Sequence, residues 1–401
     1  MLNSPQFVNP FRPGAGHMPP HLAGRHSETQ EFEKLLEQTT ILENLVLTGL
    51  RGLGKTVLLE TFKPIAIARG WLWVGADLSE AVSVSETTLA IRLLTDLSVV
   101  TSGMVLKTEP GLGFGQMELV RTLDYPFLTN LFDSTPGLVA DKIKAVLETV
   151  AAVMARDGRR GLIFAYDEAQ TLADSRARDQ YPLSLLLDVF QSIQKKDIPF
   201  MLVLTGLPTL FPKLVEARTF AERMFRVVSL SKLSPSESRD AIVKPIEEEA
   251  APVRFSEPFV EEIIKQSGGY PYFIQFICRE VFDAIIQQVE RGQPAAIPID
   301  AIIRKLDTDF FAGRWARATD RQRQLLWVIA QLGKPDAEFT VQEVVTRSSD
   351  LPKPFSPSHV NQMLAALCDA GLIYKNRWGR YSFAVPLFDR FILRQEAPTS
   401  Q

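Results

Sequence analysis

The segment Gly49–Thr56, with the sequence GLRGLGKT, constrains the fold of this chain more than any other part of it. It follows an apolar run that begins at Asn44, and a helical pattern continues from Lys55 to about Ala68. The spacing GxxxxGK[ST] places glycines where backbone N–H groups can surround an anion at the start of a helix. A strand, a phosphate-binding turn and a helix are therefore predicted in that order. The predicted phosphate-binding residues are Gly49, Leu50, Arg51, Gly52, Leu53, Gly54, Lys55, Thr56 and Val57, with Lys55 reaching the β- and γ-phosphates and Thr56 holding Mg²⁺.

Apolar runs alternate with helical patterns through the residues that follow. Near-continuous apolar strands separated by helices indicate a parallel sheet covered on both faces, so the fold class is α/β. Ahead of the first strand, Ser27 and Gln30 have the spacing of a capping box at the start of a helix. A glycine-rich segment at 111–116 is interpreted as a mobile loop. Strands are expected at 44–49, 71–79, 161–169, 199–208 and 226–233, and further helices at 85–97, 140–156 and 183–194.

Polar residues end two of the expected strands. Asp167 and Glu168 follow an apolar run, where Asp167 can reach the shell of a Mg²⁺ ion and Glu168 can act as general base toward a water. Thr205 ends the next strand and could hydrogen-bond that water or a γ-phosphate. The alternative for the two acids is that they cap the following helix.

These three elements, in this order, resemble the AAA+ ATPases, including the origin-recognition and initiator-like group and the related STAND ATPases. The resemblance covers residues 20–290 and implies a P-loop ATPase sheet and a helical lid, with ATP and Mg²⁺ bound between them. Lys55 and Thr56 resemble Walker A, Asp167 and Glu168 resemble Walker B, and Thr205 resembles sensor 1.

Two further motifs fit this resemblance. Gly24–Glu28 matches the GRxxE motif that lines the adenine pocket in such families, which assigns Arg25 to the nucleotide. Gly269–Pro271 resembles the GxP motif of the lid, where Pro271 packs near the adenine. The alternatives are solvated charges at a helix start for the first motif and a simple helix break for the second.

Arg223 and Arg226 precede the last strand, where the family carries its arginine finger. Such a residue reaches the γ-phosphate of a neighbouring subunit and compensates charge in the transition state. The resemblance therefore implies a homo-oligomer, although either arginine could instead be a solvated residue at a helix end.

The C-terminal segment 314–394 differs from the rest in charge. It holds twelve Lys and Arg against seven Asp and Glu, whereas the whole chain has a net charge of -3. Its pattern of three helices and a hairpin resembles a winged helix. Lys375, Arg377 and Arg380 lie on the hairpin beside aromatic residues and are predicted to contact the phosphates of double-stranded DNA. The expected third helix is poor in cations, so a winged helix that contacts a protein partner remains the alternative.

The domain organisation follows from these segments. We expect an extended Pro/Gly-rich arm at 1–23, a P-loop ATPase domain at 24–233, a helical lid at 234–300 and a winged-helix domain at 314–394. Apolar residues make up 46% of the chain, which supports a buried core. Two cysteines are too few for a disulfide framework, and the sequence shows neither a signal peptide nor a membrane span, so a cytoplasmic protein is expected.

The expected function is that of an AAA+-type ATPase that hydrolyses ATP with Mg²⁺ and couples its nucleotide state to DNA or partner binding through the winged helix. The alternative is a STAND-like signalling switch with slow or no turnover that acts on a protein partner. A third possibility is an ATP-binding protein with negligible turnover.

Overall fold

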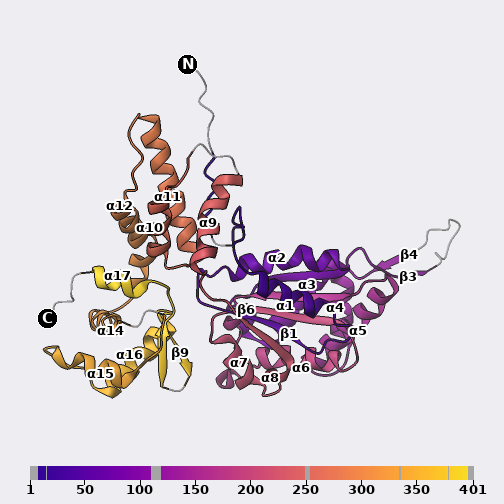
Figure 1. Cartoon of the computed structure of the whole chain (residues 1–401). Coiled ribbons are helices and arrows are strands. Elements are labelled where there is room, and N and C mark those ends of the chain that lie inside the picture. Colours follow the sequence, from indigo (N-terminus) through magenta and orange to yellow (C-terminus); the bar gives the residue numbers. More distant parts are fainter. Residues whose placement is uncertain are drawn as a thin grey trace. The chain divides into compact units, whose positions relative to one another are not determined.

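The computed structural model describes residues 8–14, 16–109, 119–248, 253–333, 336–377 and 379–395. The chain divides into two compact units, whose ribbons are drawn in Figure 1. The sheet unit comprises Arg25–Gly49 and Lys55–Leu230. The lid–wing unit comprises Met1–Gly24, Leu50–Gly54 and Ser231–Gln401. The glycine-rich segment 111–116, predicted as a mobile loop, lies outside the described residues.

The sheet unit is built on five parallel strands in the order β2-β5-β6-β1-β7. They are β1 (Asn44–Thr48), β2 (Trp71–Asp77), β5 (Gly161–Asp167), β6 (Phe200–Gly206) and β7 (Phe225–Ser229). The register pairs Leu47 with Thr205 and Asp77 with Asp167, so the carboxyl ends of the central strands meet at one edge. The predicted parallel α/β sheet is confirmed.

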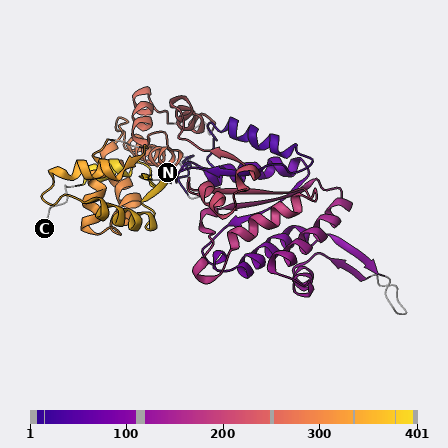
Figure 2. The ribbon, with the colours of Figure 1, turned by 90° about the horizontal axis from the view of Figure 1, so that it is seen from below.

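Helices cover both faces of this sheet, as Figure 2 shows. Helices α1 (His26–Leu36) and α2 (Lys55–Ala68) contact each other and pack against β1 and β2. A second group of mutually contacting helices comprises α3 (Glu86–Thr101), α4 (Tyr125–Ser134), α5 (Val139–Arg156), α6 (Pro182–Gln194), α7 (Leu210–Ala217) and α8 (Ala221–Met224). An antiparallel hairpin of β3 (Val105–Glu109) and β4 (Leu119–Thr122), which the sequence did not predict, follows α3.

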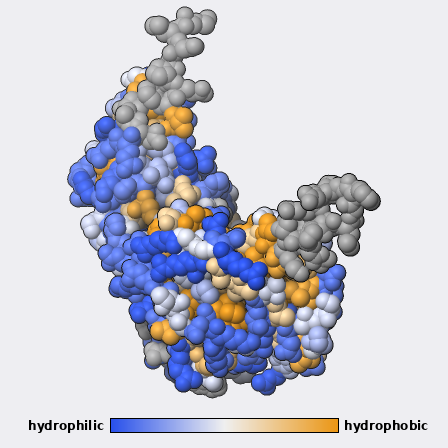
Figure 3. All heavy atoms as spheres, turned by 90° about the vertical axis from the view of Figure 1, so that its right-hand side faces the viewer, coloured by the Kyte–Doolittle hydropathy of each residue, from blue (hydrophilic) through white to orange (hydrophobic). Residues whose placement is uncertain are grey.

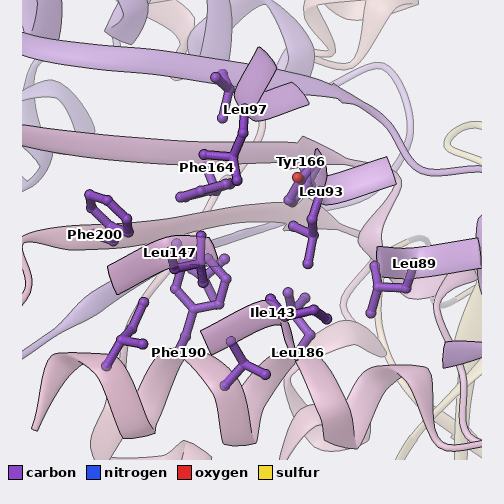
Figure 4. Packing of buried hydrophobic residues seen from close by; sticks show 14 of the residues in the cluster. Leu89, Leu93, Leu97, Ile143, Leu147, Phe164, Tyr166, Leu186, Phe190 and Phe200 are labelled. Carbon is purple, nitrogen blue, oxygen red and sulfur yellow. The ribbon is translucent and has the colours of Figure 1, made fainter. Parts of the chain in front are cut away.

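The core explains why the central strands β5 and β6 are buried along their whole length. Phe164 of β5 belongs to a large buried cluster in which its ring meets that of Phe190 of α6 at 5.0 Å, edge to face (Figure 4). On the α1–α2 side, the rings of Phe32 and Phe62 stack at 4.2 Å. Trp73 of β2 lies edge-on to Phe32. Because apolar side chains fill both faces, a strand such as β5 is fully buried rather than alternating.

The start of α1 differs from the prediction. Arg25 is the N-cap, with φ +70°, and the helix begins at His26 without a side-chain cap. Ser27 therefore already lies inside the helix, and its hydroxyl donates to Glu28 (2.8 Å). The capping-box prediction is wrong, because a left-handed turn at Gly24 and Arg25 sets the helix start before Ser27 can cap it.

The lid–wing unit is mainly helical. Its first part contains α9 (Pro235–Glu248), α10 (Glu257–Ser267), α11 (Pro271–Glu290), α12 (Ile299–Leu306), the π-helix Asp307–Ala312 and α13 (Gly313–Trp315). The described part of the N-terminal segment lies on it. Phe11 is buried and stacks on Phe255 (6.2 Å), and the Asn9 side chain donates to Asp283 of α11 (2.8 Å).

A winged helix completes the lid–wing unit, as predicted. It consists of α14 (Asp320–Ala330), β8 (Phe339–Thr340), α15 (Val341–Arg347), α16 (Pro357–Asp369), β9 (Ile373–Arg377), β10 (Arg380–Phe383) and α17 (Phe388–Arg394). The strands form an antiparallel sheet in the order β8-β10-β9. Strand β8 and helix α17 are additions to the predicted three helices and hairpin.

The exposed surface is mainly polar on the face drawn in Figure 3, where apolar residues form small groups among hydrophilic ones. Large apolar side chains with high exposure include Leu138 (78%) and Val99 (73%). Within the described ranges, no helix is both long enough and apolar enough to cross a membrane.

Candidate functional site

The turn between β1 and α2 has the backbone that the glycine spacing requires. Gly52 and Gly54 have φ values of +76° and +85°, where a side chain would be strained. Gly49 donates its N–H to the carbonyl of Gly206 on β6 (3.2 Å), which fixes the start of the turn against the neighbouring strand. A strand–turn–helix with left-handed glycines before the first helical turn is a geometry that binds anions.

Lys55 places a buried cation in this turn. Its side chain is 7% exposed, and Nζ donates to the Gly49 carbonyl at the other end of the turn (2.9 Å). A buried ammonium is stable only with such partners, and a phosphate oxygen would be a stronger one. Among the other predicted turn residues, Leu53 is buried, Leu50, Thr56 and Val57 are half-buried, and Arg51 is exposed.

Asp167 brings three separate segments together. It ends β5 and is 4% exposed. The hydroxyl of Thr56 on α2 donates to Oδ2, and the hydroxyl of Thr205 on β6 donates to Oδ1. The backbone N–H of Glu168 also donates to Oδ1 (2.7 Å). The predicted Walker A threonine, Walker B aspartate and sensor 1 threonine thus lie in one hydrogen-bonded cluster.

The donor set around Asp167 fits Mg²⁺. Mg²⁺ is held in nucleotide sites by one or two carboxylates and hydroxyls together with phosphate oxygens and water. Thr56 and Asp167 offer one hydroxyl and one carboxylate at hydrogen-bond distance from each other. Among the described residues, no group of three or more His, Cys, Asp or Glu could hold a metal ion without further ligands.

Glu168 is held in an uncommon conformation by a residue that sequence reasoning missed. Its φ of +50° is left-handed, which is unusual for a residue with a side chain. The Gln170 amide donates to the Glu168 carboxylate, and its oxygen accepts from the Leu207 N–H (3.1 Å). A Cβ on Gly206 would lie 2.5 Å from that amide oxygen, so the glycine makes room for Gln170. The signal in the sequence is only that Gln170 follows two residues after the acid.

A second acid at the same sheet edge was also missed. Asp77 ends β2 directly opposite Asp167 in the sheet register. Both residues line a cavity of about 230 Å³, whose wall also carries Thr56, Arg92 and Asp96. The sequence pattern that indicated Asp167 is an acid at the end of an apolar strand. Asp77 has the same pattern at the end of β2.

The two other motifs predicted to contact the nucleotide, Gly24–Glu28 and Gly269–Pro271, make contacts with residues near them in the structure. Arg25 is buried and forms an ion pair with Glu28 (3.1 Å), which is the contact expected for charges at a helix start. Pro271 is the first residue of α11 and is half-buried. Gly269, just before it, accepts a hydrogen bond from the Leu233 N–H (2.8 Å). A role of Arg25 and Pro271 at adenine stays a prediction.

The two candidate finger arginines differ in their surroundings. Arg226 on β7 forms ion pairs with Glu31 (2.8 Å) and Glu43 (3.2 Å) of its own unit. Arg223 on α8 is exposed, and no ion pair with it occurs among the described residues. A role of either arginine as a finger stays a prediction.

The wing carries its cations on β9 and β10. Lys375 is exposed and Arg380 is half-buried, while the side chain of Arg377 lies outside what the structure describes. Several other cations of the C-terminal segment contact groups within the chain, namely Arg314, Arg321, Arg323, Arg347, Arg390 and Arg394. The positive charge of this segment is thus only partly available to a DNA backbone.

Comparisons with known proteins identify solved structures that have a similar fold. A domain of unknown function (DUF8462) matches residues 308–392. The chain is similar to a Walker-type ATPase of Pyrococcus abyssi, with 16% identity, coverage of 93% of this chain and 96% of that chain, and a TM-score of 0.59. It is also similar to the ORC2 protein of Aeropyrum pernix in its ADP form, with 14% identity, coverage of 95% of each chain and a TM-score of 0.53. No curated protein sequence matches the chain. The chain therefore has the fold of the initiator-like AAA+ ATPases, which its sequence motifs resemble.

Proposed function

We propose that this protein is an ATPase that binds ATP with Mg²⁺ in the turn Gly49–Thr56 and hydrolyses it. The observation that carries the proposal is the convergence of Thr56 and Thr205 on the carboxylate of Asp167, beside the turn that holds Lys55. A hydroxyl from the turn and a strand-end acid are the groups that nucleotide hydrolysis places around the γ-phosphate.

Each of these residues has a step to perform. Lys55 would exchange the Gly49 carbonyl for a phosphate oxygen, since both lie at the turn. Thr56 and Asp167 would hold Mg²⁺, which neutralises charge that develops on the phosphates. Glu168 would accept the proton of the attacking water, and Gln170 orients its carboxylate by hydrogen bonding. Thr205 would donate its hydroxyl to the water or the γ-phosphate.

The nucleotide state would be coupled to DNA through the winged helix. The support is the exposed Lys375 and the half-buried Arg380 on adjacent strands of the wing. A switch that acts on a protein partner is the second candidate, and contacts between lid and winged helix favour it. Tyr270 before α11 donates to Asp336 (2.5 Å), and Arg390 of α17 donates to the Lys265 carbonyl (2.9 Å).

Replacing Lys55 by Ala should abolish ATP binding at micromolar protein, because the cation that faces the phosphates is lost. Isothermal titration calorimetry on the folded variant measures this, with Lys195→Ala as the matched control, because Lys195 is the exposed C-cap residue that follows α6. A Lys55→Ala protein that binds ATP within about threefold of wild type would show that the turn is not a nucleotide site.

Glu168→Gln should retain ATP binding and lower turnover by about 10²–10⁴-fold, because the amide keeps the shape but cannot accept a proton. Steady-state phosphate release measures the loss, and Glu216→Gln on the exposed side of α7 is the control. Equal rates of phosphate release in wild type and Glu168→Gln would exclude Glu168 as the base.

Arg223→Ala should remove any rise in specific activity with protein concentration, since a finger acts only when subunits associate. A finger supplied in trans raises kcat by about 10³–10⁵-fold. Arg226→Ala should keep the concentration dependence, because that residue is paired with Glu31 and Glu43. Wild-type activity per subunit that stays constant over a dilution series, with monomers throughout, is incompatible with a finger in trans.

Replacing Lys375, Arg377 and Arg380 together by Ala should weaken binding to every duplex sequence, because phosphate contacts position a protein without reading bases. Three such contacts contribute about -2 to -3 to the slope of log K against log salt. Fluorescence anisotropy with a labelled duplex at two salt concentrations measures both effects, and Arg347→Ala, whose partner is Asp350, is the control. If the wild-type protein does not bind the duplex at low salt in the presence of ATP, the DNA proposal is wrong. The second candidate, a switch that acts on a protein partner, then remains.

A further inference from the structure

The N-terminal segment lies on the lid in the manner of a bound peptide. Residues 8–14 belong to the same compact unit as α11 and form neither helix nor strand. Within them Pro10 and Phe11 are buried, whereas Arg12 is exposed, as are residues 16–18 further along the chain. A buried pair of residues in an otherwise irregular and largely exposed segment is typical of a peptide anchored by one or two side chains.

One face of α11 makes the polar contacts to this segment. Gln275, Arg279 and Asp283 follow each other at intervals of four residues, which places them in line along the helix. The side-chain oxygen of Gln275, a residue only 7% exposed, accepts from the backbone N–H of Arg12 (3.1 Å). The Asn9 amide donates to the Arg279 carbonyl (2.9 Å) and to Asp283 Oδ1 (2.8 Å). The lid therefore binds both the backbone and a side chain of the segment.

Phe11 is the apolar anchor. It is 3% exposed, and its ring stacks on Phe255 (6.2 Å) and meets Phe282 of α11 edge to face (6.5 Å). Asn9 Oδ1 accepts from the Phe11 N–H (3.0 Å), a local turn that fixes the backbone on which the ring is carried. We call the lid side of these contacts the arm groove, and it consists of Phe255, Gln275, Arg279, Phe282 and Asp283.

We propose that the arm groove is a peptide-binding site, and that residues 9–12 of a second copy of this chain occupy it when copies associate. The inference goes beyond the proposed function and does not depend on the nucleotide site. The segment in the groove defines the ligand as an asparagine, an aromatic residue two positions later, and a backbone N–H after that. Every copy carries both segment and groove, so an exchange between copies preserves all these contacts.

The connection between the segment and α1 is long enough for this exchange. Residues 13–24 have the sequence PGAGHMPPHLAG, which spans about 40 Å when fully extended. A segment on such a tether acts on its own groove at an effective concentration of about millimolar. The chain's own segment therefore fills the groove in an isolated copy, as in the structure. In an assembly, a neighbour's segment competes at a similar concentration.

A fluorescently labelled peptide of residues 8–14 tests the groove. The full-length Phe11→Ala variant keeps the groove and loses the anchor that fills it. Fluorescence anisotropy without nucleotide compares peptide binding by this variant and by wild type. Circular dichroism and thermal melting establish that the variant is folded, and full-length Asn9→Ala is a second, milder way to weaken the chain's own segment.

The Phe11→Ala protein should bind the peptide saturably and at least about 10-fold more tightly than wild type, whose own segment competes. A peptide with Phe11→Ala should not bind, because it lacks the anchor. Adding Asp283→Ala to the Phe11→Ala protein should weaken binding about 2- to 10-fold, the range of one hydrogen bond. Glu290→Ala, which changes another exposed acid of α11, is the matched control and should have no effect.

Disulfide crosslinking tests the occupant. Asn9→Cys and Asp283→Cys are introduced into separate full-length chains that also carry Cys368→Ser, and the chains are mixed under mild oxidation. Exchange should give a crosslinked dimer of the two chains, because the side chains of residues 9 and 283 are in contact. A mixture of Asn9→Cys with Glu290→Cys should give none. One chain with both Asn9→Cys and Asp283→Cys should crosslink internally, which establishes that the pair can react.

Each adverse result overturns a defined part of the inference. A peptide that binds neither folded Phe11→Ala nor folded Asn9→Ala overturns the arm groove, and so does equal binding of the peptide and its Phe11→Ala form. Peptide binding with crosslinks only inside the doubly substituted chain overturns the second copy as occupant. Failure of that internal crosslink would show that Asn9 does not lie at Asp283. Since all measurements are made without nucleotide, the ATPase proposal is tested separately.

Discussion

The buried carboxylate of Asp167 is the interaction on which the candidate site depends. A charge that is 4% exposed is costly unless hydrogen bonds surround it, and here the donors come from α2, from β6 and from the next residue along the chain. Thr56 and Thr205 lie far from Asp167 in the sequence, and the strand order β5-β6-β1 brings them to it. A cation bound at Asp167 would change the partners of Thr56 and Thr205 at the same time. The same carboxylate therefore joins α2 and β6 to the end of β5.

Glu168 shows how the chain positions a second acid next to this carboxylate. A left-handed residue other than glycine is strained and persists only where its surroundings hold it. Here the Gln170 amide holds the Glu168 carboxylate, and Lys213 donates to the Gln170 carbonyl (2.6 Å). Burial lowers the pKa of Lys213, while the charge of Asp174 opposes this. The orientation of the proposed base thus depends on α7 as well as on the strand that carries Glu168.

The sequence predicted those parts of the fold and site that local patterns encode. The glycine spacing of Gly49–Thr56 specifies its own strand, turn and helix, and a fully apolar run such as β5 indicates a strand buried on both faces. Gln170 could not be found this way, because its role depends on the approach of Gly206 from another strand. The cap of α1 was predicted wrongly, because the conformation of Arg25 rather than the Ser27 side chain determines where the helix begins.

The winged helix shows why net charge alone does not identify a DNA-binding surface. Arg394 is engaged with Asp307, and Arg321 lies over Phe355, so neither contributes to an open phosphate-binding surface. The lid also holds the winged helix through the Tyr270–Asp336 hydrogen bond. Burial and the charge of Asp336 raise the pKa of Tyr270, so the phenol stays protonated and remains a donor across the physiological range. Release of the winged helix from the lid would therefore require that the Tyr270–Asp336 hydrogen bond be exchanged for another interaction.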